Sequence, residues 1–492
     1  MTDLPGFAFD NSYARALDGL YLRQQAAQVP APELVWLNRP LCVELGLDAD
    51  ALDSPEGAAF FSGNAVPAGA DPLAQAYAGH QFGGFSPQLG DGRALLLGEV
   101  IDISGNRRDI QLKGSGRTPF SRNGDGKAAI GPVLREVLIG EAMFGLGIPT
   151  TRALAAVLTG ENVRREDMLP GAVLTRVAAS HIRVGTFQFF AARGDLAKLR
   201  KLADYAIARH YPDAAQTENP PLAFLDGVIA RQAALIAKWM HVGFIHGVMN
   251  TDNMAVSGET IDYGPCAFLD RHDPAAVFSS IDRQGRYAYG AQPSIALWNL
   301  TRLAESLLAL IDKDEAKAIA LAQASLDRFA ALFRTNWLAG MRAKLGLHGE
   351  EEGDQALADD FLALLAAQGA DHTLTFRRLA EAVAGDIGTL RDQLVDPKAL
   401  EPWLSRWQAR SSADPRGPAT RAAAMNGVNP VYIARNHKVE EALSAATNDR
   451  DYRPFRALLA VLADPFTEQP GLEPWAEPDP DGLAGYQTFC GT

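Results

Sequence analysis

The chain has 492 residues, 47% hydrophobic and 21% charged, which allows two or three domains or one large two-lobed unit with extensions. A net charge of -13 argues against a nucleic-acid partner, because phosphate contacts need basic surface, but a local cation cluster could still bind a nucleotide. No apolar run approaches the roughly 20 residues that span a bilayer, so no membrane partner is expected.

The N-terminal sequence and the cysteines suggest where the protein works. The start, MTDLPGFAFDNSYARAL, matches neither a signal peptide nor an Arg-rich transit peptide, so a cytoplasmic location is expected. The three cysteines, Cys42, Cys266 and Cys490, are too few for a disulfide scaffold and show no zinc-binding spacing.

The first half of the chain is expected to begin with mixed structure and continue with strands. Helices are predicted at about 31–46 and 71–78. RALLLGEVID and RDIQLKG flank the turn SGNR and predict two antiparallel strands. After the Gly-rich loop GSGRTPFSRNGDGKAAIG, the stretch PVLREVLIGEAMFGLG predicts an amphipathic helix that ends at Gly145 or Gly147. TTRALAAVLT and AVLTRVAAS predict two further strands.

Helices are predicted to dominate after about residue 185. FLDGVIARQAALIAKWMHVG, ALWNLTRLAESLLALI and EAKAIALAQASLDRFAALFRTNWLAGMRAKLG each show helical periodicity. The loop SSADPRGPATR interrupts the later helices, and the Pro-, Gly- and acid-rich tail after about residue 465 is predicted to be an extended arm.

This order of elements predicts an α+β, protein-kinase-like two-lobed fold, with a small β-rich N-lobe and a large helical C-lobe. The predicted parts are an N-terminal extension, the N-lobe, the C-lobe with the catalytic and metal loops, and a C-terminal helical extension with the tail. Their bounds are 1–80, 81–184, 185–410 and 411–492.

The strongest functional signal is HGVMNTDN, residues 246–253, followed by Asp262 in IDYG. Protein kinases and small-molecule phosphotransferases carry His-x-Asp-x-x-x-x-Asn and then Asp-x-Gly. Asn253 and Asp262 supply amide and carboxylate oxygens, which Mg²⁺ prefers beside nucleotide phosphates. The position of the usual catalytic base, however, holds Val248, which cannot accept a proton.

Asp252 is the nearest carboxylate that could replace that base, although Asp also commonly caps helices and forms turns. Lys113 ends a predicted strand, and Glu136 lies on the next helix. In kinases such a pair holds the nucleotide phosphates, because a helix glutamate steadies the long lysine side chain. A surface ion pair would give the same pattern.

Three weaker signals are consistent with phosphate binding. The turns GDGR at 90–93 and GDGK at 124–127 contain glycines that let backbone amides approach phosphates, although both tetrapeptides are common turns. Arg176 and Arg183 lie beside the predicted strands, and guanidinium groups suit phosphate oxygens.

Together these residues resemble the selenoprotein O family, pseudokinases of kinase fold that transfer AMP to proteins. The similarity covers nearly the whole chain. It is most specific in LGDGRALLLGE, QLKGSGRTPFSRNGDGKA, LREVLIGEAMFGLGIPTTRAL, HGVMNTDNM and IDYGPCAFLD, and it continues in NPVYIARNHKVEEAL. The resemblance implies that ATP binds inverted relative to kinases, so that the α-phosphate lies at the reaction centre and the γ-phosphate is buried.

The resemblance also implies a role for each candidate residue. Asp252 would be the general base, and Glu136 would support Lys113. Asn253 and Asp262 would bind Mg²⁺ or Mn²⁺. The residues implied to contact ATP are Gly90, Gly92, Arg93, Lys113, Asp125, Gly126, Arg176, Arg183 and Asp262.

The implied reaction moves AMP from ATP to a Ser, Thr or Tyr hydroxyl of a protein substrate and releases pyrophosphate. Two other activities stay open, a small-molecule phosphotransferase and a catalytically silent ATP-binding scaffold. Val248 counts against the first, because such enzymes keep an Asp there. Retention of Lys113, Glu136, Asn253 and Asp262 together counts against the second, because a scaffold does not need both implied metal ligands.

Members of the resembled family often carry a redox-active cysteine or selenocysteine near the C-terminus, and this chain has Cys490 in FCGT. The resemblance therefore implies a reversible disulfide between Cys266 and Cys490 that adjusts activity. Two free thiols are the alternative, since cytosolic disulfides are rare.

Overall fold

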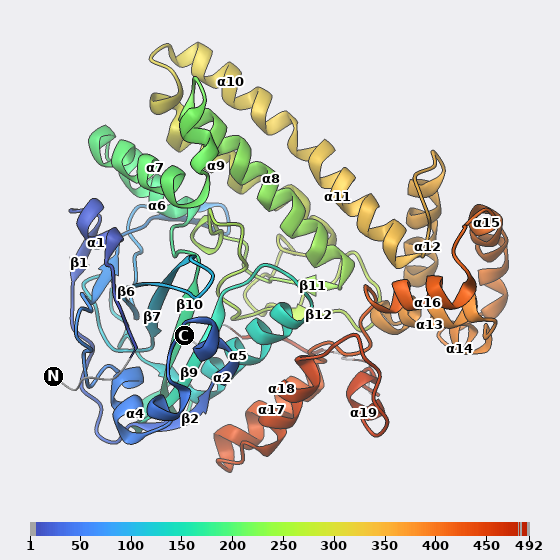
Figure 1. Cartoon of the computed structure of the whole chain (residues 1–492), viewed down its shortest axis with the longest axis horizontal. Helices are drawn as coiled ribbons and strands as arrows, with labels where there is room; N and C mark the ends of the chain where they lie inside the picture. The colour runs from blue at the N-terminus through green and yellow to red at the C-terminus, as the bar shows by residue number, and fades with distance from the viewer. Residues whose placement is uncertain (1–5, 481, 483–484, 490–492) are drawn as a thin grey trace.

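The computed structural model describes residues 6–480, 482 and 485–489. An antiparallel sheet occupies the N-terminal part of the fold, and helices make up most of the remainder (Figure 1). The strands in spatial order are β1 (Tyr21–Arg23), β3 (Leu73–Gln75), β6 (Ala94–Ile101), β7 (Arg107–Lys113), β10 (Met168–Ala178), β9 (Arg152–Arg164) and β2 (Glu33–Leu37), with β8 (Ala128–Ala129) pairing with β10. The predicted mixed fold with a β-rich N-terminal region is confirmed at this level.

The central strands of the sheet are buried on both faces, which explains their nearly continuous apolar sequences. On one face α5 (Ile130–Gly145) packs Val133 and Val137 into a large apolar cluster. On the other face α4 (Pro55–Ser62) packs Phe60 and Phe61 against the sheet. The predicted strands at β6, β7, β9 and β10 and the predicted end of α5 at Gly145 are confirmed.

Two helix predictions in the first 80 residues are wrong in part or whole. Within 31–46 the chain first forms β2 and only then a short helix, α2 (Arg39–Glu44). Within 71–78 it forms β3. Both strands pair with longer ones, β2 with β9 and β3 with β6, so tertiary pairing decides the conformation of these short apolar runs.

The helical part is built largely around α8, which delivers the chain to the HGVMNTDN segment through the short strand β11 (Phe244–Ile245). The bundle α8–α11 crosses the top of Figure 1, α12–α16 form the region at its right, and α17–α18 lie below the sheet. The bounds are α6 (Val184–Ala191), α7 (Leu196–His210), α8 (Pro220–His241), α9 (Gln292–Ile311), α10 (Glu315–Asp327), α11 (Phe329–Lys344), α12 (Asp354–Gln368), α13 (His372–Ala384), α14 (Gly388–Arg391), α15 (Glu401–Ser411), α16 (Pro418–Asn426), α17 (Asn436–Asn448), α18 (Arg453–Leu462) and α19 (Glu473–Ala476).

Several short elements complete the described fold. Two further two-stranded sheets form, the hairpin of β4 with β5 and the pair of β11 with β12. The tail predicted to be an extended arm contains the one-turn helix α19 and then packs back on the fold, where Thr488 donates to Pro265 O at 2.7 Å. The remaining bounds are α1 (Ser12–Ala16), α3 (Ala49–Leu52), β4 (Gly79–Gln81), β5 (Gly84–Ser86), β12 (Ala267–Phe268), and the 3-10 turns η1 (Pro212–Gln216), η2 (Thr251–Asn253), η3 (Tyr289–Ala291) and η4 (Pro397–Leu400).

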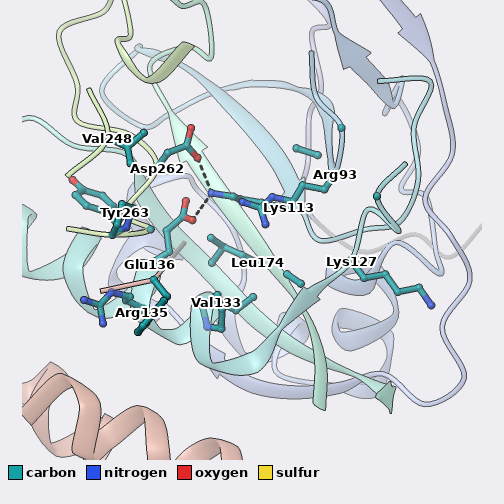
Figure 2. A pocket seen from close by; sticks show the side chains of 18 of the residues that line it. Arg93, Lys113, Lys127, Val133, Arg135, Glu136, Leu174, Val248, Asp262 and Tyr263 are labelled. Atoms are coloured by element: carbon teal, nitrogen blue, oxygen red, sulfur yellow. Dashed lines mark hydrogen bonds and ion pairs between the residues drawn. The ribbon is translucent and has the colours of Figure 1, made fainter. Parts of the chain in front are cut away.

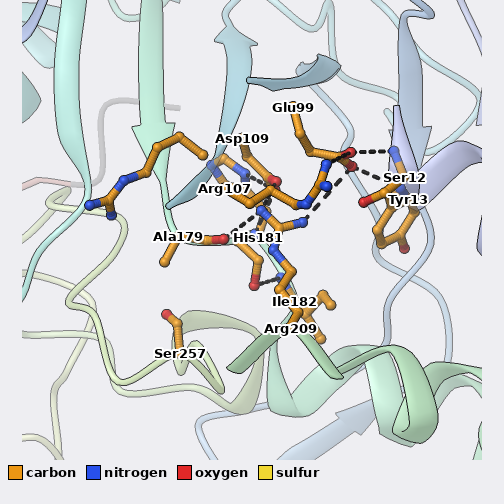
Figure 3. A network of polar contacts seen from close by, with 12 residues as sticks. Ser12, Tyr13, Glu99, Arg107, Asp109, Ala179, His181, Ile182, Arg209 and Ser257 are labelled. Atoms are coloured by element: carbon orange, nitrogen blue, oxygen red, sulfur yellow. Dashed lines mark hydrogen bonds and ion pairs between the residues drawn. The ribbon is translucent and has the colours of Figure 1, made fainter. Parts of the chain in front are cut away.

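A buried polar network fixes the sheet against α7 (Figure 3). Asp109 on β7 accepts from His181 Nδ1 at 2.9 Å and from Arg209 Nη2 on α7 at 2.6 Å. Burial alone would raise the pKa of Asp109, but Arg209 and His181 hold it at about 2. Because β10 ends just before His181, this network also fixes the chain that carries Arg176 and Arg183.

One helical stretch, Tyr289–Ile311, has the length and mean hydropathy, 1.2, of a short membrane span. Of the 18-residue window with this hydropathy, 56% is buried inside the fold, as in a helix of a protein core. Such a stretch was not expected from the sequence, because polar residues such as Asn299 and Arg302 interrupt its apolar runs.

Candidate functional site

A cavity of about 1440 Å³ opens between the sheet, α5, the loops that follow α8, and α17. Apart from the two cysteines, every predicted site residue lines it (Figure 2). These residues are Gly90, Gly92, Arg93, Lys113, Asp125, Gly126, Glu136, Arg176, Arg183, Asp252, Asn253 and Asp262. The fold thus brings together residues that lie up to 172 positions apart, from Gly90 to Asp262.

Lys113 lies at the end of β7 and bridges two carboxylates, as the dashed lines in Figure 2 show. Its Nζ is 2.5 Å from Glu136 Oε2 on α5 and 2.6 Å from Asp262 Oδ1. Its ammonium group is therefore held in one place before any ligand arrives, and the predicted strand–helix pair is not an exposed surface pair.

Two arginines complete this cluster. Arg176 Nη1 lies 3.0 Å from Glu136 Oε1 and 2.7 Å from Asp262 Oδ1. Arg183 Nη1 lies 2.8 Å from Asp262 Oδ2 and also donates to the backbone oxygen of Asp252 at 2.7 Å. The resulting group of Lys113, Arg176, Arg183, Glu136 and Asp262 is named the sheet-side cluster below.

Asp262 is the centre of the sheet-side cluster. Its backbone φ is +64°, a left-handed conformation that Asp adopts more readily than most residues. Burial alone would raise the pKa of Asp262, but the charges of Lys113, Arg176 and Arg183 outweigh burial and hold it well below the ordinary value. Asp262 is therefore ionised, and the cluster carries three cations against two carboxylates.

The turns at 90–93 and 124–127 line the cavity with their backbone, and each contains a glycine at which a side chain would clash with neighbouring atoms. Gly90 has φ +79°, and a Cβ there would lie 2.4 Å from the Phe120 ring. Gly126 has φ +72°, and a Cβ there would lie 2.2 Å from Gly116 O. Both positions require glycine, which leaves backbone amides open to a phosphate. The Asp125 carboxylate binds Arg165 at 2.9 Å at the outer side of the cavity.

Asp252 lies on the short turn η2 and differs sharply from Asp262. Its Oδ2 accepts from Gln81 Nε2 at 3.1 Å, whereas its Oδ1 is buried without a hydrogen-bond partner among the described residues. Burial raises the pKa of Asp252 to about 6, only partly offset by Arg183. A buried carboxylate oxygen left open in this way can accept a proton from a bound hydroxyl.

The donor set fits a hard cation such as Mg²⁺ or Mn²⁺. Asn253 Nδ2 donates to Val248 O at 3.0 Å, which leaves the Asn253 amide oxygen as the group that can coordinate. Asp262 Oδ2 accepts from Arg183 and keeps a second lone pair. The described residues contain no group of three His, Cys, Asp or Glu suited to a metal, so nucleotide phosphates would have to complete the coordination, as Mg²⁺ sites commonly require.

The family model described as "Protein adenylyltransferase SelO" matches residues 6–463 of the chain. The chain belongs to the SelO family. A relative in Cereibacter sphaeroides, named protein nucleotidyltransferase YdiU, is 64% identical over 488 residues, which are 99% of this chain and 100% of the relative. Relatives of the same name in Rhodopseudomonas palustris and Methylorubrum extorquens are each 60% identical, with 99% of both chains covered.

Membership in the SelO family confirms the resemblance stated from the sequence, and it makes the protein an enzyme of the nucleotidyltransferase class. ATP is the nucleotidyl donor that this class implies. The roles of the individual residues are not given by these comparisons and depend on the geometry of the cavity.

The cavity of this SelO-family protein also contains residues that the sequence did not reveal. Asp91, between the two glycines of GDGR, is buried and accepts from Gln75 N and Gln111 Nε2, so it anchors the turn to the sheet. Burial raises the pKa of Asp91 to about 6. Glu440 on α17 and Tyr486 in the tail line the opposite side and hydrogen bond to each other at 2.7 Å.

Of the two predicted redox cysteines, only Cys266 lies among the described residues of this SelO-family chain. It is fully buried beside Tyr263, and burial raises the pKa of the thiol to about 12. Cys490 lies outside the described residues. The Cys266–Cys490 disulfide therefore stays a prediction.

Proposed function

We propose that the protein transfers AMP from ATP to Ser, Thr or Tyr hydroxyls of other proteins and releases pyrophosphate. The observation that carries the proposal is the position of the open carboxylate. Val248 occupies the site of the usual kinase base, and the unpartnered oxygen belongs to Asp252 instead. A base at Asp252 rather than at position 248 implies that the phosphorus under attack is not where a kinase holds the γ-phosphorus. A kinase-like two-lobed fold that binds ATP inverted would meet this requirement, because it places the α-phosphorus at the reaction centre.

The sheet-side cluster would bind the phosphates. Lys113, Arg176 and Arg183 provide three cations on one wall, and Arg176 and Arg183 are almost fully buried. Guanidinium groups in such surroundings grip phosphate oxygens strongly, because little water competes for them. In the inverted orientation, the two arginines hold the turned phosphate end, and the glycine turns hold the remainder of the nucleotide.

Asp252 would remove the proton of the attacking hydroxyl. The hydroxyl oxygen forms a bond to the α-phosphorus, the bond from the α-phosphorus to the bridging oxygen breaks, and pyrophosphate leaves. The proton moves to the open Oδ1 of Asp252. With a pKa of about 6, this carboxylate is mostly ionised at neutral pH and can accept it.

Asn253 and Asp262 would hold Mg²⁺ or Mn²⁺, which neutralises charge on the phosphates when bound. Lys113, Arg176 and Arg183 would stabilise the negative charge that develops on the leaving pyrophosphate. Because Glu136 and Asp262 already fix these cations, little reorganisation is needed during the reaction.

A redox adjustment through Cys266 and Cys490 remains part of the proposal. Thr488 contacts Pro265, which brings the tail beside Cys266 and supports the pairing. Burial of the Cys266 thiol makes the reaction slow, since the thiolate is the reactive form. Mass spectrometry of oxidised, non-reduced protein tests it, and a lack of any Cys266–Cys490 linked peptide would remove the idea.

The transfer itself is tested with α-labelled and γ-labelled ATP in parallel, with metal, using the purified protein and a cell lysate as acceptors. Label in protein from α-labelled ATP alone is expected. Label from γ-labelled ATP would indicate a kinase without its usual Asp. Bound ATP without any label would favour a silent scaffold.

A further inference from the structure

A hairpin beside Asp252 carries an unusual turn. Strands β4 and β5 are joined by the two-residue turn Phe82–Gly83. Both residues have positive φ, +51° and +86°, the geometry of a type I′ turn. A bulky aromatic residue rarely adopts this conformation, and strained residues of this kind cluster at ligand-binding sites.

Asn250, just before the turn η2, and Tyr287 hold Phe82 in place. Its N–H donates to Asn250 Oδ1 and to Tyr287 Oη, both at 3.1 Å, and its ring lies 5.1 Å from the Tyr287 ring. Despite these contacts, 40% of Phe82 is exposed, and the residue lines the cavity. The strained conformation therefore presents an aromatic ring at the edge of the site.

The β4–β5 hairpin is fixed relative to η2, the turn that carries Asp252. Gln81 Nε2 donates to Asp252 Oδ2, and the N–H of His80 donates to Thr251 Oγ1 at 2.7 Å. Gly79 packs so closely that a Cβ there would lie 2.4 Å from Asp252 Oδ1. Anything bound to this hairpin is therefore held at a defined distance from Asp252.

The outer edge of β5 is open. His80 is opposite Phe85 in the hairpin, and the His80 N–H points away from β5 towards Thr251. His80 and Phe85 are therefore a non-hydrogen-bonded pair of the antiparallel ladder. In such a pair the backbone groups of both residues point away from the partner strand, so the N–H and C=O of Phe85 face the outer edge of β5. No described residue hydrogen bonds to them. Such an edge accepts an extended peptide as an added strand.

Two arginines lie near the two ends of β5, one at Gly83 and one at Pro87. The guanidinium of Arg286 lies over the Trp298 ring at 4.7 Å, and a Cβ at Gly83 would lie 3.8 Å from its Cζ. Arg193 donates to Pro87 O at 3.0 Å, just beyond β5. Neither arginine forms an ion pair with a described carboxylate, although the chain carries a net charge of -13. The ends of β5 therefore carry two cations without an ion-pair partner among the described residues, while the nearby Asp282 accepts from the Arg286 N–H and Glu305 lies near His80.

We propose that the β4–β5 hairpin binds an extended segment of the acceptor protein, and that this segment carries acidic side chains near the hydroxyl that receives AMP. This proposal rests on the proposed function. The segment pairs with the backbone of Phe85, contacts the Phe82 ring, and places its acidic side chains at Arg193 and Arg286. Neighbouring strands lie about 5 Å apart, so a segment outside β5 lies about 10 Å from β4, and at least three further residues at about 3.3 Å each carry the hydroxyl past the hairpin turn to the cavity.

The variant Phe85→Pro tests the open edge. It removes the outward N–H without removing a hydrogen bond of the β4–β5 pair, and proline is tolerated on such edges. Arg193→Glu combined with Arg286→Glu tests the charge. Arg334→Glu, at an exposed position on α11 outside the cavity, is the matched charge control. Melting temperature and ATP affinity, both expected to stay near wild type, show whether each variant is folded.

The acceptors are synthetic peptides with one central hydroxyl flanked by Asp/Glu, by Ala or by Lys/Arg, labelled from α-labelled ATP. Wild type is expected to label the acidic set about tenfold better than the basic set. Phe85→Pro should raise the acceptor KM about tenfold, and the double Glu variant should reverse the charge preference. Arg334→Glu should behave as wild type.

The outcomes separate the two proposals. Equal labelling of all three peptide sets, or an unchanged acceptor KM in folded Phe85→Pro, overturns docking at the hairpin and leaves AMP transfer standing. A wild-type protein that binds ATP but labels neither peptides nor lysate proteins overturns both.

Discussion

The two sides of the cavity treat buried carboxylates in opposite ways. In the sheet-side cluster, both oxygens of Asp262 and of Glu136 have cationic partners. On the turn η2, Asp252 receives one neutral hydrogen bond, from Gln81, and keeps its Oδ1 open. A buried carboxylate oxygen without a partner costs more free energy than one whose desolvation is offset by a cationic partner. The difference supports the proposal that the sheet-side cluster binds the nucleotide and that Asp252 on η2 takes part in the chemistry.

The two pKa shifts follow from the same contrast. Both carboxylates are withdrawn from water, which raises a pKa, yet the pKa of Asp262 lies well below the ordinary value and that of Asp252 rises to about 6. Three cations contact Asp262, whereas Arg183 contacts only the backbone of Asp252. One site thus fixes negative charge, and the other can exchange a proton at neutral pH.

The largest expected effect comes from a substitution of Asp262, the central carboxylate of the sheet-side cluster. Asp262→Asn removes the carboxylate proposed to bind the metal and, within the sheet-side cluster, leaves Glu136 as the carboxylate that balances Lys113, Arg176 and Arg183. AMP transfer should fall about 1000-fold, and stability should fall as well, because buried charges lose their partner. Label transfer and thermal unfolding measure the two effects. Transfer within tenfold of wild type would contradict the role given to the cluster.

A smaller loss should follow from removing one cation. Lys113→Met should reduce transfer about 100-fold and weaken ATP binding, because one phosphate contact disappears while the arginines remain. Glu136→Gln keeps the lysine but loosens it and should cost less. Equilibrium ATP affinity and single-turnover transfer measure both variants. A larger loss in Glu136→Gln than in Lys113→Met would show that the glutamate does more than hold Lys113.

The surroundings of Asp252 can be changed by a substitution at Gln81, which leaves Asp252 itself in place. Gln81→Leu removes the hydrogen bond that Gln81 donates to Asp252 Oδ2 and should lower kcat about tenfold, with ATP affinity unchanged. Gln24→Leu, at a half-buried position outside the cavity, is the matched control. A change in ATP affinity rather than kcat would assign Gln81 to nucleotide binding.

The smallest expected effect concerns the position that a kinase would use. Val248→Ala should change transfer by less than about threefold, because no proton passes through this residue, while unfolding free energy falls by about 2 kcal/mol from lost packing. Kinetics and denaturant unfolding measure these values. A loss of transfer well beyond threefold in a stable protein would place Val248 in the reaction.

The sequence predicted the parts of this comparison that local patterns encode. The strand that ends at Lys113, the helix that carries Glu136 and the HGVMNTDN segment are all marked by periodicity, by glycine or by fixed spacing. Even so, the sequence could not show that Asp262 meets three cations at once, because Arg176 and Asp262 lie 86 residues apart and meet only through tertiary packing.

Other features left no local signal. β2 and β3 read as helices because short apolar runs fit both conformations until a neighbouring strand pairs with them. Gln81 is an ordinary polar residue in the sequence and becomes significant only because β4 packs on η2. Asp91 is not among the predicted site residues, although an acidic residue between two turn glycines is a feature visible in the sequence.

The most direct test of the contrast between binding and chemistry is Asp252→Asn, a change of nearly equal size that removes the proton acceptor. ATP affinity and α-label transfer are measured on the same preparation. The account predicts ATP affinity within about threefold of wild type and transfer reduced at least about 100-fold. Transfer close to wild type would contradict Asp252 as the base, and loss of ATP binding would contradict the separation of the two sides.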